Sequence, residues 1–254
     1  MTGASAIIAD ETRLLDGRVI CFQPAKGYRS AIDPILLQAA VPARPGEHVL
    51  ELGCGAGAAA LCLARRLPDV CVLGLDVQAP LIALAGRSAL ANGLEARVRF
   101  VAGDLLDPPA AVRAGAFDHV MANPPFRKAG TSRPSPDPVK AQATVEGRAK
   151  LADWIRAAAG LVRDGGTVTV IHHGGRGDEL AELMAGSLGG LTVLPFLSQI
   201  GETRPGRVIV QGTRGAARGQ ETLPPFVLHE SGGAYTPGVD EILRGYADLA
   251  PNFA

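Results

Sequence analysis

The chain has 254 residues, with 25 Lys or Arg balanced by 25 Asp or Glu, so its formal net charge is zero. Charged residues make up 20% of the chain and hydrophobic residues 47%, which excludes a charge-rich disordered protein and a globally basic nucleic-acid coat. The length fits one large α/β domain, alone or with a small appendage.

The cysteines and the apolar runs bear on the cellular setting. Cys21, Cys54, Cys62 and Cys71 show no CxxC spacing and no pairing pattern, and the first ten residues lack a basic end followed by an apolar core. The apolar runs are far shorter than the roughly 20 residues that cross a bilayer. We therefore expect a soluble, cytoplasmic protein with no membrane partner.

The first predicted elements are a hairpin and a helix. Asp16-Gly17 lies between apolar residues from 14 to 19, which is a β-hairpin signal. Asp33-Pro34 reads as a cap and first turn, and predicts a helix over residues 35–41.

An alternation of short apolar runs and longer Ala/Leu-rich stretches begins near residue 47 and predicts a doubly wound, mostly parallel sheet. The expected strands are residues 47–52, 70–76, 97–102, 117–122 and 167–172, and the expected helices are 58–67, 79–91 and 151–162. Residues 191–197 and 206–213 are expected to close the sheet, whereas the Pro/Gly-rich stretch 214–254 carries no clear pattern. Residues 127–145 contain three prolines and predict one long internal loop.

A glycine-rich turn follows the first strand of this series, at Glu51–Gly57 (ELGCGAG). Glycines here allow a tight turn and bring backbone N–H groups close to a ligand. Gly53, Gly55 and Ala58 also fit the looser G-x-G-x-x-A dinucleotide fingerprint, so a nicotinamide or flavin enzyme stays an alternative.

Two acidic residues favour S-adenosylmethionine as the ligand, and a third does not discriminate between the cofactors. Asp76 ends the second strand and suits the ribose hydroxyls of either cofactor. Glu51 suits a ligand with a positive sulfonium or ammonium group better than a pyrophosphate, and Asp104 could accept a hydrogen bond from the adenine amine.

The tetrapeptide Asn123-Pro124-Pro125-Phe126 follows another strand and is the strongest catalytic signal. The prolines present rigid carbonyl acceptors beside the Asn amide, and Phe126 offers a flat stacking face. Such a site suits a planar amine. Asn123 and the Pro124 carbonyl would accept hydrogen bonds from its two hydrogens. Direct methyl transfer would then depend on positioning and electrostatics.

Together these motifs resemble the class I S-adenosylmethionine-dependent methyltransferases that act on amino groups of adenine, guanine or glutamine. The segments 14–18, 23–24 and 26–34, together with 207–212, 228–230 and 235–237, resemble the tRNA1(Val) adenine-N6 methyltransferase family. Many members have Tyr at the last tetrad position, where this chain has Phe126.

The resemblance implies a seven-stranded Rossmann-like sheet with an N-terminal extension over the cofactor (1–45), a methyltransferase core (46–213) and a C-terminal appendage (214–254). The implied catalytic residues are Asn123, Pro124, Pro125 and Phe126. The implied residues around S-adenosylmethionine, whose product is S-adenosylhomocysteine, are Lys26, Tyr28, Arg29, Glu51, Gly53, Cys54, Gly55, Gly57, Asp76, Val77, Asp104, Leu105 and Asn123. No metal ligand set is predicted, because the histidines lack metal-ligand spacing.

An RNA partner would have to be held by local basic clusters, because the chain is neutral. The expected RNA-binding residues beside the tetrad are Arg127, Lys128, Arg133 and Lys140, and residues 204–220 hold a second cluster. We expect methylation of adenine N6 in an RNA, and tRNA is the expected RNA. One extruded base would stack on Phe126. The alternatives are a protein-glutamine N5 or rRNA guanine-N2 methyltransferase, and a module that binds S-adenosylmethionine or RNA without turnover.

Overall fold

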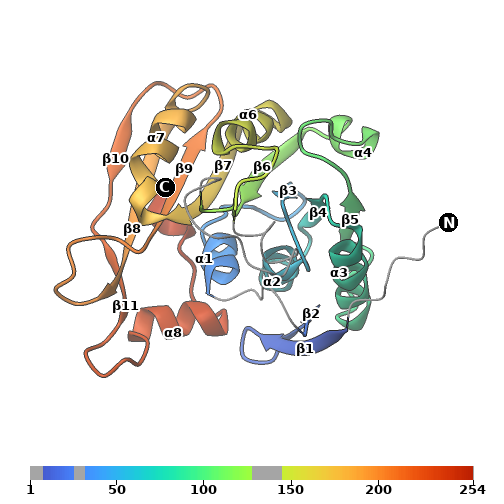
Figure 1. The fold of residues 1–254 in the computed structure, drawn as a ribbon, viewed down its shortest axis with the longest axis horizontal. Coiled ribbons are helices and arrows are strands. Elements are labelled where there is room, and N and C mark those ends of the chain that lie inside the picture. Colours follow the sequence, from blue (N-terminus) through green and yellow to red (C-terminus); the bar gives the residue numbers. More distant parts are fainter. Residues whose placement is uncertain (1–7, 26–31, 128–144, 254) are drawn as a thin grey trace.

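The computed structural model describes residues 8–25, 32–127 and 145–253. A central sheet crosses the molecule in the strand order β10-β8-β9-β7-β6-β3-β4-β5, with β11 also paired to β8 (Figure 1). Its strands are β3 (His48–Leu52), β4 (Cys71–Asp76), β5 (Val98–Ala102), β6 (Phe117–Ala122), β7 (Val162–His173), β8 (Gly189–Gln199), β9 (Arg207–Thr213), β10 (Gln220–Thr222) and β11 (Phe226–His229).

Five neighbouring strands, from β5 to β7, are parallel, and β9 runs antiparallel between β7 and β8. This confirms the predicted seven-stranded Rossmann-like sheet, which β10 and β11 extend beyond β8. β4 lies on one side of β3 and β6 lies on the other. The strand order therefore reverses beside β3, and such a switch point is where open α/β sheets bind ligands.

Helices cover both faces of the sheet, which explains why its inner strands are apolar on both sides. One buried cluster joins the sheet to α1 (Asp33–Ala39), α2 (Ala58–Arg66), α3 (Ala79–Ala91) and α8 (Pro237–Arg244). A second buried cluster joins it to α4 (Ala110–Arg113), α6 (Leu151–Leu161) and α7 (Gly177–Ala185) (Figure 1). No helix among the described residues is long and apolar enough to cross a membrane.

The predicted N-terminal hairpin is present as a separate two-stranded sheet. Its turn places residues 15–17 at positive φ values of 49°, 56° and 81°. The hairpin docks on α3, where the backbone N–H of Ile20 donates to Asn92 Oδ1 at 2.9 Å and that of Phe22 donates to Ser88 Oγ at 2.9 Å. Its strands are β1 (Ala9–Leu14) and β2 (Val19–Pro24).

The helix after the hairpin differs from its prediction in its start. It covers residues 33–39 instead of 35–41, and its N-cap is Ile32, so Asp33 is not the capping residue. The Asp33 carboxylate instead pairs with Arg207 at the start of β9. The Asp33 side chain, which the sequence pattern predicted to cap the helix, therefore forms a long-range ion pair instead.

The C-terminal residues form β10, β11, α8 and a short 3₁₀ helix, η2 (Ala250–Phe253). Both strands pair in parallel with β8, one after the other along its free edge. α8 buries Val239 and Ile242 on the α1 side of the sheet. The sequence pattern missed these elements, as it missed α4, α7 and the early start of β7.

Candidate functional site

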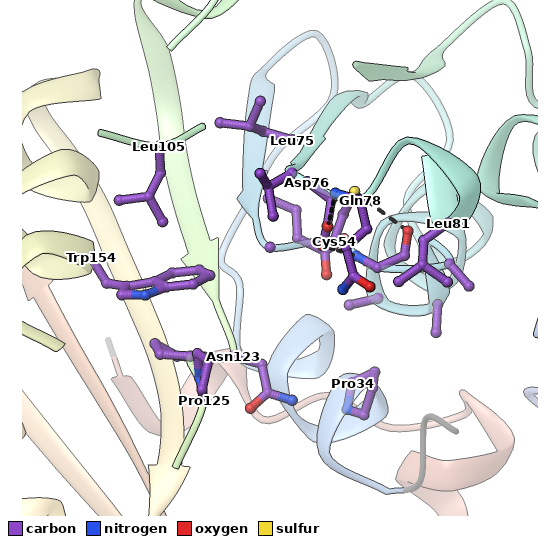
Figure 2. A pocket seen from close by; sticks show the side chains of 18 of the residues that line it. Pro34, Cys54, Leu75, Asp76, Gln78, Leu81, Leu105, Asn123, Pro125 and Trp154 are labelled. Atoms are coloured by element: carbon purple, nitrogen blue, oxygen red, sulfur yellow. Dashed lines mark hydrogen bonds between the residues drawn. The ribbon is translucent and has the colours of Figure 1, made fainter. Parts of the chain in front are cut away.

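A cavity of about 220 Å³ lies at the carboxyl edge of the parallel strands, beside the switch point. The turn after β3 and the ends of β4, β5 and β6 line it, together with residues of β2, α1 and α6. Figure 2 shows Asp76, Cys54 and Gln78 on one side of this space and Asn123, Pro125 and Trp154 on the other. The motifs that the sequence singled out therefore meet in one place.

The glycine-rich turn needs glycine for two different reasons. Gly53, Gly55 and Gly57 all have positive φ values, of 68°, 53° and 84°. A Cβ on Gly53 would also lie 2.4 Å from the Trp154 ring, and one on Gly57 would lie 2.6 Å from the Phe100 ring. A Cβ on Gly55 would meet nothing within 4 Å, so this glycine faces open space beside the cavity.

Asp76 ties the end of β4 to this turn. Its carboxylate accepts the backbone N–H of Gly55 at 2.9 Å and that of Gln78 at 2.8 Å. Burial raises its pKa, although these backbone N–H groups act in the opposite direction. The next residue, Val77, is 53% exposed and adds an apolar surface to the cavity. A carboxylate at Asp76 followed by an apolar side chain at Val77 suits the ribose and base of a nucleoside.

Glu51 is the second acidic group of the cavity and is only 5% exposed. It accepts the backbone N–H of Ala60 at 2.9 Å. Burial, with a smaller contribution from nearby Asp76, raises the pKa of Glu51 to about 8. No Lys or Arg within the described ranges forms an ion pair with either carboxylate. The cavity therefore fits a ligand that carries its own positive charge, since a cation would favour the ionised carboxylates.

Asp104 and Leu105 line the cavity just after β5. Asp104 accepts the Leu106 backbone N–H at 2.9 Å and lies 3.4 Å from the exposed Arg148 guanidinium. Its carboxylate thus stabilises the local turn and still reaches the cavity wall. Leu105 lies near Trp154 (Figure 2).

The tetrad Asn123–Phe126 follows β6 directly and all four residues line the cavity. Pro124 is buried, whereas Asn123 and Phe126 are half-buried at the opening. The Phe126 ring stacks beside His173, with 6.3 Å between centroids and 22° between planes. The exposed Arg127 guanidinium lies 5.3 Å from the Phe126 centroid. An amide, rigid carbonyls and a flat ring are therefore presented together next to the acidic cavity.

Trp154 is a cavity residue that sequence reasoning assigned to the core. The helical pattern of α6 marks its side chain as buried, and it is 8% exposed. The helical periodicity of the sequence marks a buried face of α6, but it does not show that this face borders the cavity. The residues Gln23, Pro24, Asp33, Pro34 and Leu37 were also missed as lining residues, because only the fold brings β2 and α1 to this edge.

The remaining residues of the predicted site, most of them basic, fall into three groups. Arg127 is described, while Lys26, Tyr28, Arg29, Lys128, Arg133 and Lys140 lie outside the described residues. In the second predicted cluster, Arg207 pairs with Asp33, and Arg214 binds Asp164 and the carbonyls of Ala159 and Val162. These two arginines therefore make ion pairs and hydrogen bonds within the folded protein. Within the described ranges, no group of three His, Cys, Asp or Glu side chains could hold a metal ion.

Comparisons with known proteins agree with this geometry. The family model of the methyltransferase small domain matches residues 32–193, more than half of the chain. The chain is 29% identical over 206 residues to the tRNA1(Val) (adenine(37)-N6)-methyltransferase of Aeromonas salmonicida, covering 80% of this chain and 84% of that protein. It is 40% identical over 79 residues to the release factor glutamine methyltransferase of Chlorobaculum tepidum, covering 31% of this chain and 27% of that protein.

Among solved structures, the chain is similar to a predicted O-methyltransferase from Agrobacterium tumefaciens, with a TM-score of 0.69 and 25% identity. That match covers 85% of this chain and 97% of the other. The sheet order, the glycine-rich turn and the acidic cavity all fit the cofactor of such enzymes. The chain belongs to the methyltransferase small domain family and is an S-adenosylmethionine-dependent methyltransferase.

Proposed function

We propose that this protein methylates the exocyclic N6 amine of an adenine in RNA, with tRNA as the substrate. The observation that carries this proposal is the position of Asn123–Phe126 in the wall of the acidic cavity. The tRNA1(Val) relative from Aeromonas salmonicida, which the chain matches over most of both lengths, supports adenine and tRNA.

Within this proposal, the residues lining the cavity hold the cofactor. S-adenosylmethionine supplies a methyl group on a positively charged sulfonium. Glu51 and Asp76 provide the negative field, and Asp76 also presents its carboxylate to the ribose. Val77 and Leu105 provide apolar surface for the adenine, beside Asp104. The glycines at 53, 55 and 57 and Cys54 keep the backbone close to the ligand.

The tetrad acts on the acceptor amine. An amine attached to a purine ring is a poor nucleophile, because its lone pair is delocalised into the ring. Asn123 Oδ1 and the Pro124 carbonyl accept its two hydrogens, which concentrates electron density on nitrogen. Phe126 stacks on the base, and Pro125 limits the freedom of the loop. Orientation and fixed dipoles then supply most of the acceleration.

We also propose that the RNA approaches beside the tetrad. Arg127 is exposed next to Phe126, and Lys128, Arg133 and Lys140 follow it in the sequence. Because the whole chain is neutral, phosphate contacts should be few and the salt dependence of binding shallow. Residues 1–45 would act as an extension over the cofactor, 46–213 as the catalytic core and 214–254 as an appendage.

The deciding experiment incubates the purified protein with methyl-labelled S-adenosylmethionine and either total tRNA or rRNA from a strain lacking the gene. Mass spectrometry of the nucleosides should show N6-methyladenosine in tRNA. A labelled 2′-O-methyl nucleoside or N2-methylguanosine would contradict the proposal. No label in either RNA or in release factors, with cofactor binding intact, would favour a binding module without turnover.

A second acceptor, a protein glutamine, is favoured by one observation. The tetrad suits any planar amine, and a release factor glutamine methyltransferase matches 79 residues, or 31%, of this chain at 40% identity. That match spans 27% of the relative, which leaves most of its length without a counterpart. Label in release factors and none in RNA would identify this alternative.

A further inference from the structure

Strand β7 ends in two histidines that have no part in the function proposed above. His172 is 4% exposed, and neither of its ring nitrogens finds a hydrogen-bond partner among the described residues. β7 pairs with β6, so its carboxyl end lies beside the residues that follow β6. His172 is therefore an unsatisfied polar group buried next to the catalytic tetrad.

An unpartnered buried imidazole is costly, because a buried donor or acceptor without a hydrogen-bond partner has lost its contacts with water and gained none in return. Burial lowers the pKa of His172, and the nearby Arg176 guanidinium lowers it further. The neutral ring keeps one N–H to donate. The backbones of His173 and Pro125 act in the opposite direction on this pKa, and neither makes a complete hydrogen bond to the ring.

His173 contacts the tetrad from the exposed side. Its Nδ1 accepts the Gly175 backbone N–H at 3.1 Å, which fixes the orientation of the ring. Held in this way, the ring lies nearly parallel to Phe126, at 6.3 Å between centroids. Aromatic pairs attract each other at this separation. The stack limits the directions in which Phe126 can turn.

We propose that His172 and His173 are positioning residues that hold the tetrad in the geometry needed by the acceptor amine. His172 donates to the Pro125 carbonyl when the acceptor is bound, which fixes the peptide next to the Pro124 carbonyl. His173 keeps Phe126 in the plane on which the base stacks. This inference rests on the proposed function, because it concerns the same acceptor site.

His172→Leu tests the buried half of the proposal, and His172→Gln keeps a donor. The leucine variant should lower kcat about 10- to 100-fold, because small misplacements of reacting groups have effects of this size. The affinity for S-adenosylmethionine should change less than about twofold, and the glutamine variant should recover much of kcat.

The matched control for His172 is His119→Leu. His119 is also a buried histidine of this sheet, but Thr167 and Glu47 bond its ring nitrogens at the opposite end of β6. Its loss should lower thermal stability and leave kcat unchanged in the folded protein. If His172→Leu retains wild-type kcat, or if the two variants lower kcat equally, the proposal fails.

His173 is tested by comparing His173→Ala with His173→Phe. The alanine variant should lower kcat/KM for the RNA about tenfold, whereas phenylalanine keeps the stack and most of the activity. The control is His229→Ala, which removes a histidine stacked on Tyr235 at 4.7 Å, in the C-terminal appendage. A wild-type protein that methylates no RNA would overturn the proposed function. An active wild type with unaffected His173→Ala kinetics would overturn only this inference.

Discussion

Glu51 and Asp76 are both buried along the cavity, yet their surroundings hold them differently. Asp76 receives two backbone hydrogen bonds to its carboxylate, from the turn and from the start of α3. Glu51 receives one, from Ala60, and is almost completely buried. Backbone N–H groups stabilise the ionised form of a carboxylate, and burial opposes it. Glu51 is therefore the acid whose charge depends most on the bound cation.

This difference predicts a pH dependence of cofactor binding. With a pKa of about 8 in the free protein, Glu51 is mostly protonated at pH 6–7. A sulfonium favours the ionised form, so binding releases a proton and affinity rises by up to about tenfold per pH unit until pH 8. Titration calorimetry of wild type and Glu51→Gln measures this slope, which the variant should lack. Glu47→Gln, at the opposite edge of the sheet, should retain it.

The same group affects folding stability. The folded-state pKa of Glu51, about 8, lies above the ordinary value of 4.5, so the folded protein binds more protons than the unfolded chain between these values. Stability therefore falls as pH rises from 4.5 to 8, and this contribution is absent in Glu51→Gln. Urea denaturation at several pH values should show a smaller decline for the variant. Equal declines would contradict the assignment.

Asn123 gives the most direct test of the tetrad. Asn123→Ala removes the amide acceptor at the opening of the cavity, and we expect kcat to fall at least about 100-fold, as for other preorganised catalytic dipoles. Cofactor affinity should change little, because Glu51 and Asp76 remain. The control is Asn252→Ala, whose side chain donates to the nearby Leu249 carbonyl. Unchanged turnover of Asn123→Ala would contradict the mechanism.

The meeting of the glycine-rich turn and the tetrad at one cavity could be predicted from the sequence, because each motif is a short run of residues at the end of a strand. The residue types of Glu51–Gly57 and Asn123–Phe126 carry their own chemistry, and strand ends bring them together. Trp154 could not be predicted as a cavity residue, since its role depends on how α6 packs against Gly53. His172 shows no sequence signal either, because only the three-dimensional arrangement leaves its ring without partners.

At the scale of elements, the β3-turn-α2 unit combines backbone conformation with close packing. Its buried strand and Ala-rich helix could be predicted, because apolar runs between helical patterns are typical of parallel sheets. β10 could not, since its three residues are all exposed and carry no apolar alternation. The same limit explains why the pattern placed the start of β7 at residue 167: residues 163–165, just after Val162, are polar or glycine and exposed.

The turn predicts different outcomes for two glycines. Gly53→Ala and Gly55→Ala both force a side chain into positive φ, at a cost of about 1–2 kcal/mol. Only Gly53→Ala also collides with Trp154, which adds about 1–3 kcal/mol of overpacking. Thermal denaturation without cofactor should therefore show a lower Tm for Gly53→Ala. Equal Tm values for the two variants would mean that α6 moves away from the added methyl group without a loss of stability.

At the scale of the whole molecule, Arg66 on α2 links segments that are distant in the sequence. Its guanidinium donates to the side chain of Gln38 at 2.9 Å and to the carbonyls of Gln38 and Val41, and it pairs with Asp248 at 3.0 Å. Burial lowers its pKa, and Asp248 acts in the opposite direction. One side chain thereby joins α1, α2 and the C-terminal segment.

Arg66→Ala should be strongly destabilising, by about 3–5 kcal/mol, because it leaves buried acceptors without a donor. Arg65→Ala is the matched control on the same helix, since Arg65 makes one exposed hydrogen bond, to the Asn92 carbonyl. Its effect should stay within about 1 kcal/mol. Urea denaturation followed by circular dichroism compares the two. Similar midpoints would show that the Arg66 contacts are dispensable.

The contact between the hairpin turn and the C-terminal segment has a consequence for the order of folding during synthesis. The Tyr246 hydroxyl donates to Asp16 at 3.1 Å, and the Arg18 guanidinium lies 4.9 Å from the Tyr246 ring. Asp16 and Tyr246 are 230 residues apart in the sequence, so a ribosome must release residue 246 before this contact can hold the hairpin. Gln23 and Pro24 of that hairpin line the cavity. We therefore expect a nascent chain to form its sheet early and to gain cofactor affinity last.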